Sequence, residues 1–89
     1  MDDQQMKLVE QGLAAQKLLA AEAFNSTINQ LVDAAFQNFV NSKPEQNDVR
    51  EASYHHYRAL VEIVSTLQQR VQIKTEIEAN EDDNNQEEE

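Results

Sequence analysis

The sequence predicts an all-α protein, built as a long antiparallel helical hairpin that ends in a disordered acidic tail. Three observations lead to this prediction. The 89 residues include one glycine and one proline, the two residues that interrupt helices most strongly. Apolar residues recur at steps of three and four, which is the spacing of one helix face. Eight of the seventeen carboxylates lie within residues 75–89, where there is no lysine or arginine.

The first predicted helix covers about residues 5–41. Its apolar face is formed by Leu13, Ala20, Phe24, Ile28, Leu31, Ala35 and Phe39, and is widened by Val32, Phe36 and Val40. Gly12 weakens this helix by ~1 kcal/mol relative to alanine without ending it. Asn25, Ser26 and Thr27 are poor helix formers, because their side chains compete for backbone hydrogen bonds. A break there would give three helices instead of two, and this alternative stays open.

A turn at residues 42–47, around Pro44, leads to a second predicted helix over about residues 48–78. Two pairs have the spacing of a capping box that would open this helix: Ser42 with Glu45, and Asp48 with Glu51. Steps of three and four, the spacing of a coiled-coil seam, connect Tyr57, Leu60, Val64, Leu67 and Val71. Lys74 and Glu78 interrupt this seam after about two heptads, so we do not expect an extended coiled coil.

The acidic end of the chain has the composition of a disordered segment. Residues 80–89 contain no apolar side chain, and their charges are all negative. Such a segment cannot offset the entropy lost on ordering. We therefore predict one helical hairpin over residues 1–79 and a disordered tail over residues 80–89. Without the last fifteen residues the chain has nine acidic and seven basic residues, so the hairpin itself is nearly neutral.

A chain of this length buries only about 60% of its unfolded surface and usually needs additional stabilisation. It has no cysteine for disulfides, so association is the remaining source. Two helices alone would leave half of each wide apolar face in water, whereas two paired hairpins would bury both in a four-helix bundle. We expect a homodimer; a compact three-helix monomer, folded at a break near Asn25, is the competing solution. The predicted self-association interface comprises Phe24, Ile28, Leu31, Val32, Phe36, Phe39, Tyr57, Leu60, Val64, Leu67 and Val71.

The sequence carries no motif for catalysis, a metal or a cofactor. Adjacent helical residues point about 100° apart, so His55 and His56 cannot readily hold one ion. Glu51 and His55 lie one turn apart, but a tight site needs three or four ligands. We therefore expect a solvated His55, and His56 and Tyr57 at a helix interface. One glycine cannot build a phosphate-binding or oxyanion loop, and the sequence thus predicts a protein that is not an enzyme.

One pattern of residues in the sequence resembles that of a known class of proteins. It consists of Asp48-Val49-Arg50-Glu51, Tyr54, Arg58-Ala59-Leu60 and the seam at Leu67 and Val71. Together with the paired phenylalanines, the turn and the acidic end, it is similar to small helical-hairpin accessory proteins encoded by tailed bacteriophages. The resemblance covers roughly residues 24–78. It implies a viral accessory protein in the host cytoplasm or the virion, which acts in particle assembly or against a host factor, and it implies no particular site residue.

Charge and hydropathy restrict the partners. The lysines and arginines are scattered, so we expect no direct binding of nucleic acid. No apolar run approaches the ~20 residues that span a bilayer, and we expect no membrane partner and a cytoplasmic location. The predicted function is a self-associating protein–protein interaction module, an assembly or adaptor protein, whose acidic tail could steer a basic partner. The alternative is an acidic inhibitor that blocks a host nucleic-acid-binding or defence enzyme by DNA mimicry.

Overall fold

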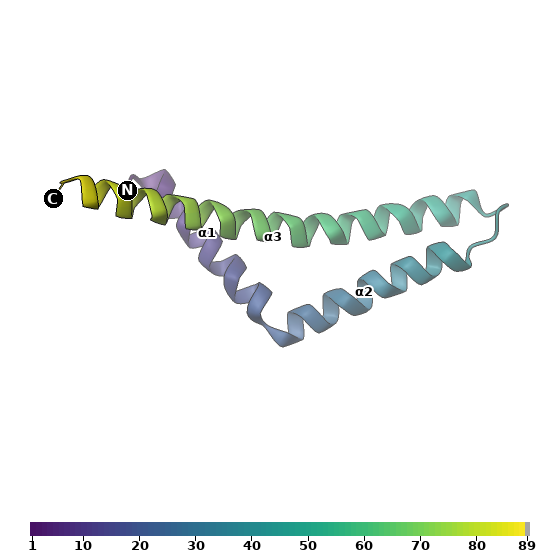
Figure 1. Ribbon diagram of the computed structural model, residues 1–89. Helices are drawn as coiled ribbons and strands as arrows, with labels where there is room; N and C mark the ends of the chain where they lie inside the picture. Colours follow the sequence, from purple (N-terminus) through teal and green to yellow (C-terminus); the bar gives the residue numbers. More distant parts are fainter. Residues whose placement is uncertain (89) are drawn as a thin grey trace. The chain divides into compact units, whose positions relative to one another are not determined.

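The computed structural model describes the backbone of residues 1–88 and the side chains of residues 1–82. Three helices, α1 (Asp3–Ala20), α2 (Glu22–Asn41) and α3 (Asn47–Glu88), make up this part of the chain, which contains no strand (Figure 1). The predicted all-α class is confirmed. The chain divides into two units. In unit 1, Met1–Ala20 packs with the segment from Thr66 onward, and unit 2 is Ala21–Ser65.

The first segment is two helices, not the continuous helix predicted over residues 5–41. The break falls at Ala21, whose backbone is extended with φ −78° and ψ 118°. The predicted weak point lies one turn later and is helical, and its hydroxyls make hydrogen bonds within the helix. Thr27 Oγ1 donates to the Ala23 carbonyl at 2.8 Å, and Gln30 Nε2 donates to Ser26 Oγ at 3.4 Å. The alternative with a break in the first segment is therefore correct, but the break lies at Ala21 and not near Asn25.

The break separates two apolar stripes that would lie on different sides of one continuous helix. The less exposed residues at steps of three and four are Gln5, Leu8, Gly12, Ala15 and Leu19 in α1, and Phe24, Ile28, Val32, Ala35 and Phe39 in α2. Five residues separate Leu19 from Phe24, so a straight helix would turn the second stripe by about 140° relative to the first. The extended residue at Ala21 lets each stripe pack within its own unit. Leu13 and Ala20, predicted on the apolar face, are exposed instead.

Helix α3 carries a seam that is longer than predicted. Buried and half-buried side chains recur at steps of three and four at Arg50, Ser53, Tyr57, Leu60, Val64, Leu67, Val71, Lys74, Ile77 and Glu81. Lys74 does not interrupt the seam, because the aliphatic part of its side chain is packed while its ammonium group keeps an ionic partner. Its side chain is 14% exposed, and Nζ lies 2.7 Å from Glu78 Oε1. Sequence reasoning counted Lys74 as polar and missed this arrangement.

The predicted end of the second helix at about residue 78 and the disordered tail over residues 80–89 are not confirmed. Helix α3 continues through Glu88. Continuing an existing helix adds one hydrogen bond per residue and needs no new nucleus, and glutamate and glutamine are good helix formers. Residue 89 and the side chains beyond Asp82 lie outside the described part of the chain.

The turn between α2 and α3 uses Ser42 differently from the prediction. Ser42 Oγ donates to the Phe39 carbonyl at 2.6 Å, so this residue caps the end of α2 rather than opening the next helix. The Lys43 amide donates to Gln46 Oε1 at 2.9 Å and closes the turn. Asp48, the other predicted cap, already lies inside α3.

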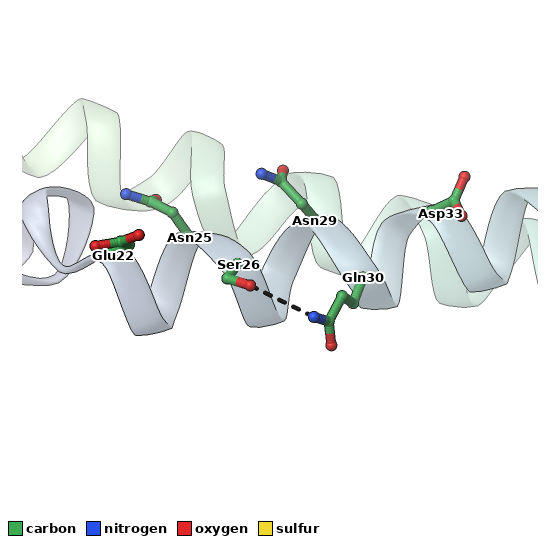
Figure 2. A pocket seen from close by; sticks show the side chains of 6 residues that line it. All are labelled: Glu22, Asn25, Ser26, Asn29, Gln30 and Asp33. Carbon is green, nitrogen blue, oxygen red and sulfur yellow. Dashed lines mark hydrogen bonds between the residues drawn. The ribbon is translucent and has the colours of Figure 1, made fainter.

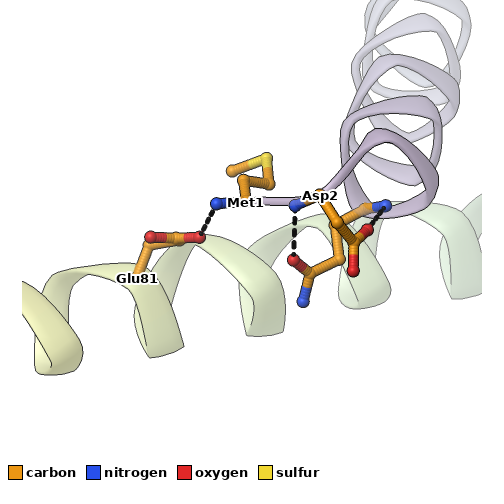
Figure 3. Close-up of polar contacts among 4 residues, drawn as sticks. Met1, Asp2 and Glu81 are labelled. Atoms are coloured by element: carbon orange, nitrogen blue, oxygen red, sulfur yellow. Dashed lines mark hydrogen bonds and ion pairs between the residues drawn. The ribbon is translucent and has the colours of Figure 1, made fainter.

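The start of α1 has a capping box that sequence reasoning missed (Figure 3). The Gln5 amide donates to Asp2 Oδ1 at 2.7 Å, and the Asp2 amide donates to Gln5 Oε1 at 3.1 Å. An acidic residue followed three positions later by glutamine is the signature that would have predicted it. Beside this cap, the Met1 ammonium lies 2.8 Å from Glu81 Oε1 of α3.

Gly12 is buried where α1 meets α3 in unit 1. A Cβ atom at this position would overlap the Lys74 Cβ and lie 2.7 Å from the Arg70 carbonyl oxygen. The carbonyl belongs to the backbone of α3 and cannot turn aside, so only glycine permits this close approach of the two helices.

Replacing Gly12 by alanine tests this packing. Helix propensity alone would stabilise the variant by ~1 kcal/mol. The clash should exceed this gain, and we expect Gly12→Ala to lower the free energy of unfolding by about 1–2 kcal/mol. Thermal unfolding followed by circular dichroism measures the change. As a control, Ala14→Gly on the exposed side of α1 should lose only the propensity term, ~1 kcal/mol. A higher melting temperature for Gly12→Ala would contradict the close contact.

The ion pair at Met1 predicts a pH dependence of stability. The hydrogen bond to Glu81, followed by the charge of that carboxylate, raises the pKa of the Met1 ammonium above its ordinary value of 8.0. Because the pKa is higher in the folded state, the pair stabilises fully below pH 8.0, and this contribution is lost as the pH rises through the raised pKa. The melting temperature should fall over that range. Glu81→Gln should remove the dependence, and an equal fall in that variant would contradict the assignment.

Candidate protein interface

The chain has a very small core. Among the described side chains, the buried hydrophobic ones are Ala15, Ala35 and Leu60. Large hydrophobic side chains with exposed fractions of 38–55% are Met1, Met6, Leu13, Leu18, Leu31, Phe36, Val40, Val49, Tyr54, Ile63 and Ile73. Single exposed apolar residues are normal, but clustered ones mark interaction surfaces.

All five aromatic residues of the chain belong to unit 2, and four of them line one groove. Phe36 and Phe39 of α2, with Tyr54 and Tyr57 of α3, line a groove of about 230 Å³. Phe39 and Tyr57 are half-buried and form its floor, whereas Phe36 and Tyr54 are 50% and 49% exposed. The groove is thus open to solvent and lined by rings, a composition typical of protein–protein interfaces.

The positions of these residues along the chain explain why they meet. Phe36 and Phe39 precede the turn at a spacing of three, and Tyr54 and Tyr57 follow it at the same spacing. Phe39 lies two residues before the end of α2 at Asn41, and Tyr54 lies seven residues after the start of α3 at Asn47. Both pairs are thus within about three turns of the connection, where the two helices of unit 2 pack together. Sequence reasoning used Phe36, Phe39 and Tyr57 as members of longer stripes and missed the cluster. The repeated spacing of three between aromatic residues, once on each side of the turn, is the signal that could have found it.

Polar contacts reinforce one end of the groove. The Arg50 guanidinium carbon lies 5.3 Å from the centre of the Phe39 ring, within the range of a cation–π interaction. Beside it, the Tyr54 and His55 rings meet edge to face with their centres 5.7 Å apart. Arg50 is half-buried, so its positive charge lies over an aromatic floor rather than free in solvent.

A larger hollow lies along α2 (Figure 2). It has a volume of about 510 Å³ and is lined by Glu22, Asn25, Ser26, Asn29, Gln30 and Asp33. Every lining residue comes from the same helix, so no second element supplies an opposing wall. Binding sites for small molecules enclose most of their ligand. We therefore regard this polar hollow as a solvated helix face and the smaller aromatic groove as the stronger candidate.

The histidine cluster has an open geometry. His55 Nε2 lies 3.8 Å from Glu51 Oε1, and both side chains are about 70% exposed. Within the described residues, no group of three histidine, aspartate, glutamate or cysteine side chains could hold a metal ion. His56, expected at a helix interface, is exposed, whereas Tyr57 is half-buried as an interface residue would be.

Most residues of the predicted self-association interface pack inside the chain. Leu60 is buried, and the half-buried ones are Phe24, Ile28, Val32, Phe39, Tyr57, Val64, Leu67 and Val71. Leu31 and Phe36 are exposed, at 42% and 50%. In unit 2, the surface that remains open to a partner is therefore formed mainly by side chains outside the predicted interface.

Comparison with known proteins adds no relative. The chain has no significant match among protein-family models, curated proteins or solved structures. Among the described residues, no helix is both long and apolar enough to cross a membrane.

The contact between Arg50 and Phe39 can be measured by a double-mutant cycle. Arg50→Gln and Phe39→Leu, alone and together, should give a coupling free energy of about 0.5–1 kcal/mol in unfolding experiments. Arg58 provides the control, because its guanidinium pairs with Glu62 at 3.8 Å on an exposed surface. Arg58→Gln should show no coupling to Phe39→Leu. Equal coupling for both arginines would contradict the cation–π assignment.

Proposed function

We propose that this chain is a non-enzymatic, self-associating interaction module that acts as an assembly or adaptor protein. The aromatic groove is the observation that supports the proposal most directly. Aromatic residues and arginine dominate the energetically important positions of protein interfaces. Here Phe36 and Tyr54 line the open groove, and the Arg50 guanidinium lies over the ring of Phe39, which lines it too.

The small core supports the same proposal. Each unit contains two helical segments. Each segment buries only the part of its apolar face that contacts the other segment, and the rest of that face stays in water. In unit 2 the exposed large hydrophobic residues are Leu31, Phe36, Val40, Val49, Tyr54 and Ile63. Burying a large apolar side chain completely contributes about 1.5–3 kcal/mol. Association with a second copy would bury these side chains and gain this free energy without an additional helix.

The resemblance to accessory proteins of tailed bacteriophages gives the proposal a biological setting. In that setting the module would act in particle assembly or against a host factor, in the host cytoplasm or in the virion. A basic protein is a candidate partner, because residues 75–89 hold eight carboxylates and no base. Its approach would be steered over a Debye length of ~8–10 Å.

A second candidate function is inhibition of a nucleic-acid-binding or defence enzyme by DNA mimicry. The backbone of α3 continues as a helix through Glu88, and this favours it, because phosphate mimicry needs a regular backbone rather than a disordered one. In the acidic segment after Thr75, however, two of the described carboxylates are already paired: Glu78 with Lys74, and Glu81 with the Met1 ammonium. This pairing reduces the charge that could bind a basic groove, and the candidate ranks second.

Truncation separates the two functions. Ending the chain at Asp82 removes four carboxylates and keeps the Met1–Glu81 ion pair. For an interaction module, sedimentation equilibrium should show the same concentration-dependent molar mass for the truncated and the full chain. Added salt should preserve or strengthen the association, because it screens repulsion between acidic copies. A molar mass of one chain at all concentrations would contradict self-association. Partner binding that is lost on truncation and weakens steeply with salt would favour mimicry.

A further inference from the structure

We propose that two copies of this chain pair about a two-fold axis through the aromatic groove, so that apolar side chains of α2 from one copy enter the groove of the other. The inference rests on the proposed self-association and specifies its surface. It differs from the seam that the sequence predicted, because most residues of that seam pack inside the chain.

The groove has the features of a self-complementary surface. A two-fold interface uses the same patch on both copies, so the patch must contain a projection and a hollow. Val40 lies one turn after Phe36 on the same side of α2 and is the most exposed large hydrophobic residue, at 55%. Phe39 and Tyr57 form the floor of the hollow beside it. Each copy can therefore offer Val40 and Phe36 as projections and accept those of its partner.

The charge distribution favours a second copy as the occupant. Unit 2 has six acidic and three basic residues, a net charge of −3, which leaves −7 of the chain's −10 to unit 1. Two copies repel each other less through unit 2 than through unit 1, and unit 2 holds the groove. A basic partner would instead be drawn to the acidic segment after Thr75. A groove whose four lining residues carry no charge thus fits a second unit 2 better than it fits a basic protein.

The exposed area indicates a modest affinity. Phe36 and Tyr54 each present roughly 100 Å², half of the 150–250 Å² of an aromatic side chain. A stable interface buries about 800 Å² per partner, so pairing must also cover adjoining parts of α2 and α3. We expect a dimer with a dissociation constant that is roughly micromolar.

The test compares two serine variants of α2 in the full chain. Phe36→Ser removes a groove residue, whereas Leu31→Ser removes a residue of similar exposure that lies about 140° away around the helix. Sedimentation velocity over a range of concentrations should show the wild type and Leu31→Ser approaching twice 10.2 kDa. Phe36→Ser should weaken dimerisation by roughly 30-fold or more.

A second variant keeps the inference testable if Phe36→Ser is poorly folded. Val40→Glu changes a more exposed side chain and places a negative charge in the proposed interface of both copies. It should keep the helical circular dichroism of the wild type and stay monomeric. Unchanged dimerisation of a folded Val40→Glu, or dissociation in Leu31→Ser alone, would overturn the groove as the interface but leave self-association intact. A monomeric wild type at every concentration would overturn the proposed function as well.

Discussion

A helix that packs against only one other helix cannot bury a wide apolar face, and this constraint underlies the structure. Helix α3 is the shared element, because its first part packs with α2 and its later part with α1. Its seam of residues at steps of three and four gives each neighbour a narrow line of contact. Side chains beside that line stay in water, which explains why the described core comprises two alanines and one leucine.

The two units satisfy this constraint with different residues. In unit 1, small side chains bring the helices close together, since Gly12 lies against the backbone of α3 at Arg70. In unit 2, large rings hold them, and Phe39 is half-buried beneath the Arg50 guanidinium. At Gly12, the small residue gives close contact between the backbones of the two helices. Rings leave part of their surface exposed, and so the candidate interface lies in unit 2.

The candidate interface could have been predicted from the sequence, but the apolar stripes of the two helices do not reveal it. Phe36 fits the apolar stripe of α2 as a widening residue, and Tyr54 fits no stripe of α3. What relates them is the repeated spacing of two aromatic pairs, Phe36 with Phe39 and Tyr54 with Tyr57, one pair on each side of the turn. The long predicted interface stays a prediction, and most of its residues are half-buried within the chain. Helical spacing shows that residues share a face, but it cannot show whether that face meets the same chain or another.

The sequence by itself determined the helical class and the single turn before α3, because both follow from local propensity, spacing and the placement of glycine and proline. The tertiary structure decided the break at Ala21, since alanine is the best helix former and nothing local interrupts the helix there. It also decided that Lys74 belongs to the seam and that the acidic end continues α3. In each case packing against a neighbouring segment, or continuation of a helix already formed, outweighed what the local residues favour.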